Sequence, residues 1–563
     1  MQSSLLQVSL GLLMLVRITL QASSATSSHY TGAVVEYYPV RGQFKETDSG
    51  TRIANENAKN FETILKKATE YAVDIIVFPE NSLLAGFVFS FTNRSHYPEF
   101  SSFLPDPKDS VTPCENSTSN VMEAVKTISC AAKRYSIYVV MNIPEKQNCT
   151  GIENCPYDGY FFYNTNIAFN RQGAIVARYR KYDLYAEPGF DRPPKPEIST
   201  FLTDFNVTFG QLSCLDILFQ DPALRLVRDL KVTNVLVPTH RYTELPFLAT
   251  IPTQLAWSYV NDVNLLSAGY NLPVSLRPSG SGGSGIYAGK RGGILAITRS
   301  DAPRNILLVA KISKDIRSPA VKDYGSHVET YVFKTSEIST TVKIEEIRWQ
   351  GLVREDLSQY TTRAMVPGNE TYNQTLCNRG LCCDFFVRVN YNSEVIRKPN
   401  VNYYRYRFAV FNGVRKLTGF TSAGVEVCGI ISCTNDTQDS CRFTFTKNAT
   451  VVHPVTFESV VVSGNFSTGP DVLRLPITLT TDVVPLNISD FSFASKDAND
   501  THANVAFSLV RPQKRLMTFA VYGRNFAADG KDITSGASMV ILLDQLALIL
   551  INLTLLFSGI VRI

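Results

Sequence analysis

The pattern of apolar and polar positions predicts alternating strands and helices over residues 30–338. Apolar residues recur at helical spacing in residues 55–72, 121–133, 223–230 and 243–260. Short apolar runs of the kind found in buried strands occupy residues 74–79, 136–144, 209–214, 232–238 and 264–270, and residues 160–169 and 174–179 have the pattern of a hairpin. This alternation predicts an α/β domain in which sheets and helices form layers.

The pattern changes after about residue 340, where short runs rich in Phe, Val, Tyr and Thr predominate. Strands are expected at residues 384–390, 404–411, 443–446, 455–462 and 473–480. Six of the eleven cysteines lie between residues 377 and 441. These features predict a second, smaller and mostly β domain at residues 345–522, cross-linked by disulfides.

The N-terminus has the pattern of a secretory signal peptide. An apolar run at residues 5–20 is followed by small residues at positions 22–25. We place the signal peptide at residues 1–25, with cleavage within about residues 22–28. A buried N-terminal helix is the alternative interpretation of the apolar run.

The C-terminus has the pattern of a GPI-anchor signal, which we place at residues 530–563. Residues 539–563 are largely apolar and follow a polar stretch with small residues. A single transmembrane helix is the alternative, although Asp544 would be costly inside lipid. Either way, we expect the mature protein to be tethered at the extracellular face of the plasma membrane. The candidate attachment residues are Asp529, Gly530, Ser535 and Gly536.

Sequons and cysteines agree with an extracellular location. Acceptor sequons for N-glycosylation occur along the whole chain, at Asn93, Asn116, Asn148, Asn206, Asn369, Asn373, Asn435, Asn448, Asn465, Asn487 and Asn499. In an oxidising compartment most of the eleven cysteines should pair, and the odd number leaves at least one over.

Composition excludes some classes of partner. The net charge is only +5 over 563 residues and no Lys/Arg run is present, so we expect no nucleic-acid partner. Only six histidines occur, which argues against a His-rich metal site. We therefore expect no metal, and we expect no cofactor.

Common catalytic signatures are missing from the chain, namely G-x-S-x-G, H-E-x-x-H, the Walker motif and paired C-x-x-C. Polar residues that follow buried strands are the remaining candidates, because α/β folds keep their sites there. Glu80 follows the strand at 74–79, Lys181 follows the hairpin and Cys214 ends the strand at 209–214. Taken singly, the first two are ordinary surface charges. Cys214 lies 59 residues from the nearest other cysteine, Cys155, and is the best candidate for the unpaired thiol.

Together these three residue types have a chemical logic. A thiolate attacks an amide carbon efficiently when a base removes the thiol proton and a nearby cation stabilises the negative charge. A carboxylate in a dry pocket can be that base. A lysine beside it can stabilise the oxyanion of a tetrahedral intermediate.

The segments around these residues resemble the three catalytic segments of the nitrilase (carbon–nitrogen hydrolase) superfamily. They read VFPE at 77–80, RYRKYDLY at 178–185 and LSCLDILF at 212–219. Further segments, such as YNTN at 163–166, LCC at 381–383 and VEVC at 425–428, are similar to the vanin and biotinidase branch. The resemblance covers nearly the whole chain.

This resemblance implies an α-β-β-α sandwich and a Glu–Lys–Cys triad. Glu80 would be the general base, Lys181 the electrostatic stabiliser and proton donor, and Cys214 the nucleophile. A second glutamate often helps to hold the lysine in the superfamily; by its offset Glu197 is the better match, and Glu187 is the alternative. The N–H of Leu215 would join the oxyanion hole.

The resemblance also implies the substrate, a secondary amide of a vitamin conjugate. Pantetheine, cleaved to pantothenate and cysteamine, is the leading candidate. Biotinyl amides are the alternative substrates. A further alternative is that the protein is a catalytically silent surface glycoprotein. The chain departs from its branch where Thr-Ala-Trp is usual and Thr239-His240-Arg241 stands instead. We expect His240 and Arg241 to contribute to the substrate pocket.

Overall fold

The structure of the protein is a computed structural model. It describes residues 22–40, 50–84, 94–116, 120–185, 187, 189–271, 281–298, 304–318, 327–331, 354–368, 370–417, 421–445 and 449–532. The apolar run at 5–20, the interdomain boundary expected at 338–345 and the C-terminal apolar tail lie outside these residues. No helix within the described part of the chain is long and apolar enough to cross a membrane.

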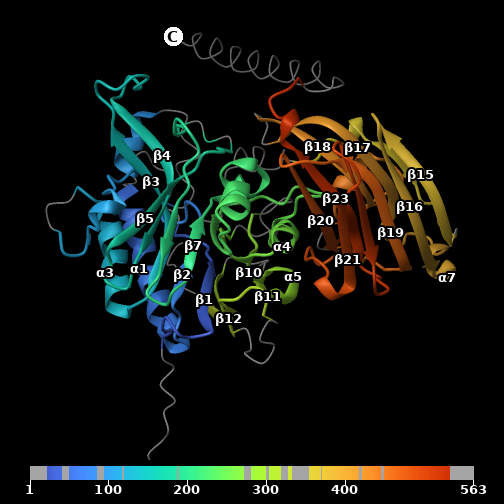
Figure 1. Ribbon diagram of the computed structural model, residues 1–563. Helices are drawn as coiled ribbons and strands as arrows, with labels where there is room; N and C mark the ends of the chain where they lie inside the picture. The colour runs from blue at the N-terminus through green and yellow to red at the C-terminus, as the bar shows by residue number, and fades with distance from the viewer. Residues whose placement is uncertain are drawn as a thin grey trace, which may run out of the picture.

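The first domain contains two sheets packed face to face (Figure 1). The seven-stranded sheet has the order β13-β12-β1-β2-β3-β4-β5. Its strands are β1 (His29–Glu36), β2 (Ile75–Val77), β3 (Tyr138–Asn148), β4 (Tyr160–Phe169), β5 (Ile175–Arg180), β12 (Asn305–Ser313) and β13 (His327–Tyr331). The six-stranded sheet has the order β11-β10-β9-β8-β7-β6. Its strands are β6 (Thr200–Leu202), β7 (Thr208–Gln211), β8 (Asn234–Thr239), β9 (Asn264–Gly269), β10 (Ser284–Ala288) and β11 (Gly293–Thr298).

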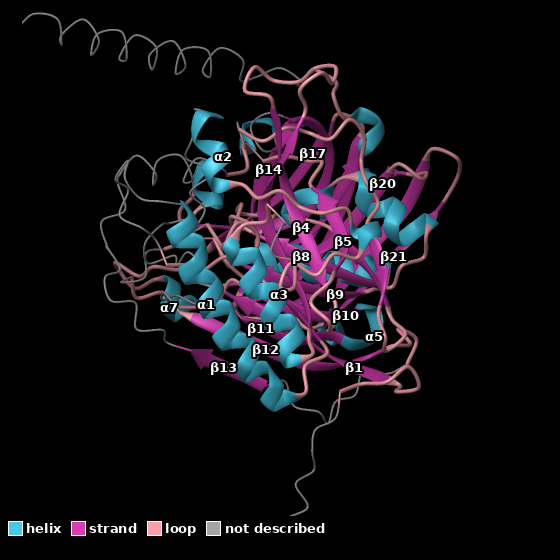
Figure 2. Ribbon diagram, turned by 90° about the vertical axis from the view of Figure 1, so that its left-hand side faces the viewer, coloured by secondary structure: helices cyan, strands magenta, loops and turns pink. Residues whose placement is uncertain are grey.

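Helices cover the outer face of each sheet. Helices α1 (Gly50–Ala68) and α3 (Glu123–Tyr135) lie side by side on the seven-stranded sheet (Figure 2). Helices η6 (Gln220–Asp229) and α4 (Thr250–Asn261) share a core with the six-stranded sheet. Apolar residues of both sheets form the core between them, as expected for strands with two buried faces. The first domain is therefore an α-β-β-α sandwich, which confirms the predicted fold class.

Short helices complete the first domain. They are η1 (Thr69–Tyr71), η3 (Arg94–His96), α2 (Tyr97–Phe100), η4 (Pro107–Asp109), η5 (Cys214–Leu218) and α5 (Gly289–Gly292). Of these, η5 directly follows β7 and carries the candidate nucleophile.

The second domain is a β-sandwich of two five-stranded sheets with the orders β14-β17-β18-β23-β20 and β15-β16-β19-β22-β21. Buried and exposed residues alternate along β16, which is the pattern of a strand with one face in a core. The strands are β14 (Thr361–Ala364), β15 (Thr371–Asn378), β16 (Leu381–Tyr391), β17 (Arg405–Leu417), β18 (Thr421–Cys433), β19 (Val455–Ser467), β20 (Val472–Thr480), β21 (Phe491–Asp497), β22 (His502–Leu509) and β23 (Leu516–Asn525). Its short helices are η7 (Leu357–Gln359), α7 (Ser393–Ile396), η8 (Asp439–Arg442), η9 (Ile488–Asp490) and η10 (Phe526–Ala528).

Two predicted elements differ from the structure. The helix expected at 243–260 begins only at Thr250, because Pro246 cannot donate a backbone hydrogen bond and residues Glu244–Leu248 form a tight bridged turn instead. The strand expected at 443–446 is wrong for its described residues, since 443–445 have no strand pairing. The ring of Phe445 packs against Tyr404 there, with centroids 5.0 Å apart.

Five disulfides cross-link the described cysteines. The pairs are Cys114–Cys130, Cys149–Cys155, Cys377–Cys382, Cys383–Cys428 and Cys433–Cys441. Cys214 is the free cysteine and is buried. The prediction that Cys214 is the unpaired thiol is confirmed.

The two domains share one hydrophobic core behind the nucleophile turn. Residues of η5 and α4 belong to the same apolar cluster as residues of β17, β18, β20 and β23. The ring of Phe247 lies between Tyr360 and Tyr522, with centroid distances of 5.8 and 6.0 Å. The buried Arg524 guanidinium donates a hydrogen bond to the carbonyl of Leu218 at the end of η5. The second domain therefore supports the segments that follow β7 and β8.

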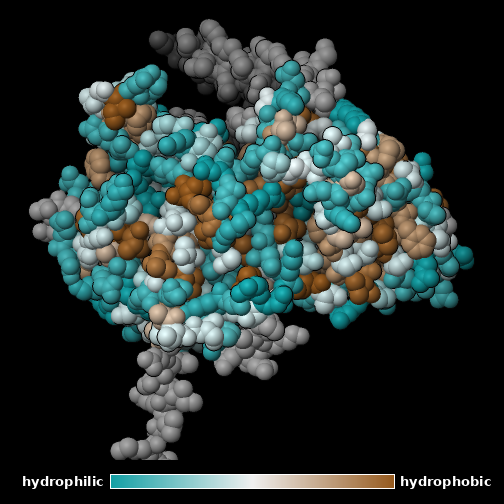
Figure 3. Space-filling model, in the orientation of Figure 1, coloured by the Kyte–Doolittle hydropathy of each residue, from teal (hydrophilic) through white to brown (hydrophobic). Residues whose placement is uncertain are grey.

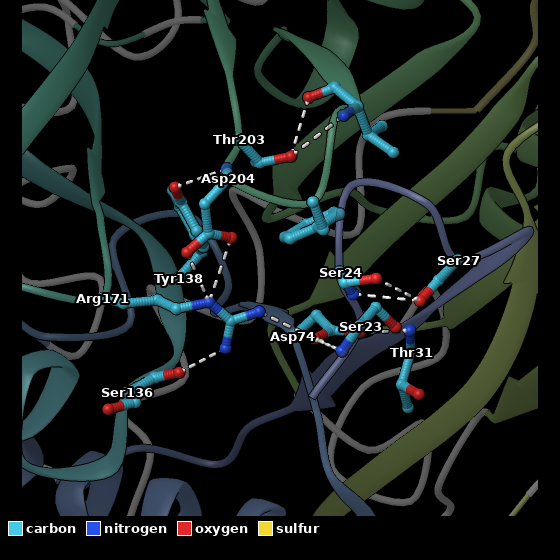
Figure 4. Close-up of polar contacts among 12 residues, drawn as sticks. Ser23, Ser24, Ser27, Thr31, Asp74, Ser136, Tyr138, Arg171, Thr203 and Asp204 are labelled. Carbon is cyan, nitrogen blue, oxygen red and sulfur yellow. Dashed lines mark hydrogen bonds and ion pairs between the residues drawn. The ribbon is translucent and has the colours of Figure 1, made fainter. Parts of the chain in front are cut away.

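The first described residues are bound to a buried carboxylate at the start of β2. Asp74 accepts hydrogen bonds from the backbone N–H groups of Ser23 and Thr31, each at 2.8 Å (Figure 4). Arg171 forms an ion pair with the same carboxylate at 2.7 Å. Ser23 thus belongs to the folded domain, which fits cleavage at the early end of the 22–28 range better than a signal peptide that extends to residue 25.

Hydrophilic residues are spread over the face of both domains shown in Figure 3, with apolar residues scattered among them. Most described sequon asparagines are exposed, namely Asn148, Asn206, Asn373, Asn435, Asn465, Asn487 and Asn499, whereas Asn116 is half-buried. Asn93, Asn369 and Asn448 lie outside the described residues. The exposed positions are consistent with the predicted glycosylation.

Candidate active site

Strand ends of both sheets bring Glu80, Lys181 and Cys214 to one buried place. Glu80 lies just beyond β2, Lys181 directly follows β5, and Cys214 begins η5 after β7. Their exposed fractions are only 1%, 1% and 5%. Glu80 and Lys181 both act electrostatically on the Cys214 thiol. These residues come from three separate strands, so only the folded sandwich assembles them.

Lys181 is held between two carboxylates. Its Nζ lies 2.7 Å from Oε1 of Glu80 and 2.5 Å from Oε1 of Glu187. Asn164 Nδ2 donates hydrogen bonds to Glu80 Oε1 at 2.8 Å and to Glu187 Oε2 at 3.0 Å. This network fixes the orientation of both glutamates and of the lysine between them.

The preference for Glu197 as the second glutamate is wrong. The side chain of Glu197 is about one third exposed and its carboxylate lies 4.0 Å from Arg180. Glu187, the alternative, makes the contact with Lys181. The chain turns back after Lys181, so the glutamate only six residues away reaches the ammonium group and the more distant one does not.

Glu80 is also held on its second oxygen. The backbone N–H of His240, just beyond β8, donates a hydrogen bond to Oε2 at 2.8 Å. Burial alone raises the pKa of Glu80, but the charge and hydrogen bond of Lys181 outweigh it and hold this pKa below its usual value. Glu80 is therefore an ionised carboxylate in a dry site, as a general base must be.

Two carboxylates keep Lys181 charged. Burial lowers the pKa of Lys181, and the negative charges of Glu187 and Glu80 raise it by more, to well above its usual value. Burial raises the pKa of Glu187, and the attraction of Lys181 offsets this only in part. Lys181 is thus a permanent ammonium group beside the thiol.

The turn that carries Cys214 is sharply bent. Cys214 has a φ of 48°, a left-handed conformation that is uncommon for residues other than glycine. The Ser213 N–H donates a hydrogen bond to Asp216 Oδ2 at 2.7 Å, and the Tyr179 hydroxyl donates to the same oxygen at 2.6 Å. Asp216 therefore closes the turn around the cysteine from inside the core. Strain of this kind is typical of functional sites.

Leu215 lies in the first turn of η5 and is buried. Backbone N–H groups in the first turn of a helix have no acceptor within that helix. The Leu215 N–H, one residue from the sulfur, is thus positioned at the start of the helix as an oxyanion donor requires.

Cys214 is a neutral thiol at rest. Burial raises its pKa, the charge of Glu80 raises it further, and Lys181 lowers it only in part, so that the pKa reaches about 12. A thiolate is the attacking species, so the proton must leave as the bond to the substrate forms. This arrangement requires a neighbouring base and not a preformed thiolate.

His240 and Arg241 are buried beyond β8, next to the triad. The imidazole of His240 stacks on Tyr270 with ring centroids 4.0 Å apart and an interplanar angle of 9°. Both terminal nitrogens of Arg241 are buried and have no hydrogen-bond partner among the described residues. The structure thus places both residues at the site.

Sequence reasoning assigned no role to three residues that shape the site. They are Asn164, which bridges the two glutamates, Asp216, which closes the nucleophile turn, and Tyr185, whose hydroxyl is buried without a hydrogen-bond partner. Asn164 lies within the family-like segment YNTN, which was the available signal. Tyr185 ends the segment RYRKYDLY and Asp216 lies within LSCLDILF, and neither residue has a distinguishing pattern of its own.

Other predicted positions fall outside this site. Asp529 forms a partly buried ion pair with Arg524 at 2.7 Å, and the Gly530 N–H donates to the carbonyl of Ser422, so both anchor candidates belong to the folded domain. Ser535 and Gly536 lie outside the described residues. Among the described residues, no group of three or more His, Cys, Asp or Glu side chains could hold a metal ion.

Two family models match the chain. Residues 49–230 match the carbon-nitrogen hydrolase model and residues 350–529 match the Vanin C-terminal domain model. The first match contains Glu80, Lys181 and Cys214. The two matches correspond to the sandwich that carries the site and to the β domain that supports it.

Curated relatives match over most of the chain. Vanin-like protein 1 of Drosophila melanogaster is 31% identical, over 90% of this chain and 87% of its own. A pantetheine hydrolase of Homo sapiens is 32% identical, over 82% of this chain and 84% of its own. The biotinidase of Homo sapiens is 30% identical, over 85% and 84%. With the carbon-nitrogen hydrolase domain, these relatives show that the chain is a hydrolase acting on amide C–N bonds, and that it belongs to the vanin family.

Proposed function

We propose that the protein hydrolyses pantetheine to pantothenate and cysteamine through an acyl-thioester on Cys214. The observation that carries the proposal is the hydrogen-bonded Glu80–Lys181 pair acting on a buried free thiol. Relatives named pantetheine hydrolase and pantetheinase, about 30% identical over most of the chain, support this substrate.

In the first half of the reaction, Glu80 accepts the thiol proton while the sulfur attacks the amide carbon. The carbonyl oxygen becomes an oxyanion, which Lys181 and the Leu215 N–H stabilise. When the intermediate collapses, the C–N bond breaks and Glu80 returns the proton to the nitrogen. Cysteamine leaves, and the pantothenoyl group stays on Cys214 as a thioester.

In the second half, water replaces the amine. Glu80 accepts a proton from the water as its oxygen attacks the thioester carbon. The C–S bond breaks, the sulfur takes the proton back from Glu80, and pantothenate leaves. Asn164 and the His240 N–H hold the Glu80 carboxylate in place throughout both halves.

Hydrolysis of biotinyl amides is the second candidate, because a biotinidase matches this chain as closely as several pantetheinases. The same triad would serve both substrates. The departures at His240 and Arg241 are predicted to contribute to the substrate pocket, so an assay is needed to discriminate the two substrates.

The test is to incubate the purified chain from Ser23 to Asp532 with pantetheine and with biocytin, and to measure free cysteamine and biotin. We expect cysteamine from the parent and none from Cys214→Ala. Release of biotin alone would support the second candidate. Absence of any hydrolysis, with Cys214 free and the protein folded, would favour the catalytically silent glycoprotein.

We also propose that the mature protein is GPI-anchored at the extracellular face of the plasma membrane. The C-terminal pattern of the sequence, the exposed sequons and the five disulfides support this location. Treatment of expressing cells with a phosphatidylinositol-specific phospholipase C should release the protein. Retention on the cell, while a known GPI-anchored protein is shed, would favour a transmembrane helix.

A further inference from the structure

Arg241 is a buried cation whose terminal groups are not used within the fold. Its side chain is 4% exposed, and neither Nη1 nor Nη2 has a hydrogen-bond partner among the described residues. An isolated buried charge is strongly destabilising, and proteins rarely keep one unless something pairs with it. Arg241 therefore needs a partner that the described residues do not provide.

The position of Arg241 is set by the strands that build the site. Strands β7 and β8 are parallel neighbours, with Gln211 paired to Leu236. The chain beyond β7 leads to Cys214, and the chain beyond β8 leads to Arg241. His240 donates its backbone N–H to Glu80, so Arg241 follows directly after the residue that contacts the general base. The charge of Arg241 also lowers the pKa of Cys214, which is consistent with this placement.

The carboxylates nearby are committed to other groups. Glu244 lies 3.2 Å from Arg415, which also pairs with Glu355. Glu80 accepts hydrogen bonds from Lys181 and Asn164 on one carboxylate oxygen and from the His240 N–H on the other. None of these carboxylates makes a hydrogen bond to Arg241.

A second orphan donor lies in the same place. The Tyr185 hydroxyl is buried without a hydrogen-bond partner among the described residues, and the Tyr185 ring lies 6.2 Å from the ring of Tyr242, the residue after Arg241. Arg241 and Tyr185 thus offer a planar fork and a hydroxyl beside the nucleophile. A guanidinium fork matches the paired oxygens of a carboxylate or phosphate.

We propose that Arg241 binds an anionic group, carboxylate or phosphate, of the amide substrate, close to the bond that is cleaved, with Tyr185 as a second donor. The predicted effect on substrate preference rests on the proposed function, amide hydrolysis at Cys214. It makes the preferred substrate an anionic amide, so neutral pantetheine is a poorer substrate than its anionic relatives.

The first test requires no hydrolysis. The rate of Cys214 alkylation by iodoacetamide is measured with added propionate, inorganic phosphate or neutral propionamide. The anions should protect Cys214 at least about 10-fold more effectively than propionamide, and Arg241→Met should abolish the difference while Arg241→Lys keeps part of it. Equal protection by propionate and propionamide in the parent protein would overturn the inference, and this comparison needs no variant to fold.

The second test uses matched amides. Pantetheine is compared with N-pantothenoylcysteine, which has a carboxylate next to the scissile nitrogen, and with pantetheine phosphorylated at its far hydroxyl. We expect N-pantothenoylcysteine to exceed pantetheine in kcat/KM by about 10-fold, and Arg241→Met to remove that preference while changing pantetheine hydrolysis less. Preference for this analogue would support an anion site beside the cleaved bond, and preference for the phosphorylated amide alone would overturn that placement.

Arg192→Met is the matched control, because Arg192 is exposed and stacks on Tyr182 at the edge of the site. It should leave both protection and substrate preference unchanged. Pantetheine hydrolysis without anion preference or protection would overturn the inference and leave the proposed function standing. Anion protection that is lost in Arg241→Met, without hydrolysis of any of the amides, would support the site and overturn the proposed function.

Discussion

Lys181 donates a hydrogen bond to Glu187 across 2.5 Å inside the first domain. This contact makes Glu187 a positioning residue, since the same ammonium group lies 2.7 Å from Glu80. Without Glu187, Lys181 would keep its charge and its contact with Glu80, but it would lose the second carboxylate that fixes its ammonium group. The identity of the second glutamate can therefore be tested directly.

Glu187→Gln should lower kcat by on the order of 10²-fold, because a displaced Lys181 stabilises the oxyanion poorly. Glu197→Gln is the matched control, as its carboxylate is partly exposed and lies 4.0 Å from Arg180. Steady-state kinetics on an accepted amide measure both. A larger loss in Glu197→Gln than in Glu187→Gln would contradict the assignment.

Cys214→Ala should remove all covalent turnover, since no other free thiol is present among the described cysteines. In the folded parent, iodoacetamide should add a single carbamidomethyl group, and peptide mapping should locate it on Cys214. Label on any of the disulfide-bonded cysteines, with Cys214 unmodified, would remove the nucleophile from the mechanism.

Lys181→Met should lower kcat by about 10²–10³-fold or more, the scale for losing an oxyanion donor. The substitution also leaves two buried carboxylates without their cation, so the folded state must be checked by circular dichroism. A folded variant with the kcat of the parent would rule out an electrostatic role for Lys181.

The pH dependence of kcat/KM follows from the two shifted groups. Glu80 acts as a base when ionised, and its pKa lies below the usual value of 4.5. The acid limb should therefore lie below pH 4.5. The Cys214 pKa of about 12 means that ionisation of this thiol adds no limb to the profile in the neutral range. A rise centred near pH 8.5, the ordinary thiol value, would show that Cys214 ionises without Glu80.

Arg415→Met should destabilise the protein by about 3–5 kcal/mol, the usual cost of removing one partner from a buried ion pair. Arg415 joins Glu244 of the first domain to Glu355, and all three side chains are largely buried. Denaturant unfolding measures the loss. Arg515→Met, which breaks an exposed pair with Asp482, should cost less than about 1 kcal/mol.

Much of the fold could be predicted because its strands are buried on both faces. The apolar run at 74–79 is β2, and the hairpin expected at 160–179 is β4 and β5, in antiparallel pairing. The three family-like segments identified Glu80, Lys181 and Cys214, whose separation in sequence gives no hint of contact.

The remaining features depend on tertiary packing. Glu187 and Glu197 both follow Lys181 in a loop, and only the path of that loop decides which glutamate reaches the ammonium group. Residues 443–445 have the composition of a strand, but they follow the Cys433–Cys441 disulfide and pack their rings on Arg354 and Tyr404. Neither feature could be predicted from the local sequence pattern.

The disulfide pattern has a consequence for the order of oxidation during folding. Four of the five bridges join cysteines 5, 6, 8 and 16 residues apart, and only Cys383–Cys428 spans as many as 45 residues. Short loops close quickly and at little entropic cost. The cysteine nearest to Cys214 in sequence is 59 residues away, so the other cysteines can pair with their close neighbours before they meet Cys214. The spacing of cysteines along the chain is thus expected to favour a free thiol at Cys214 before the folded core encloses it.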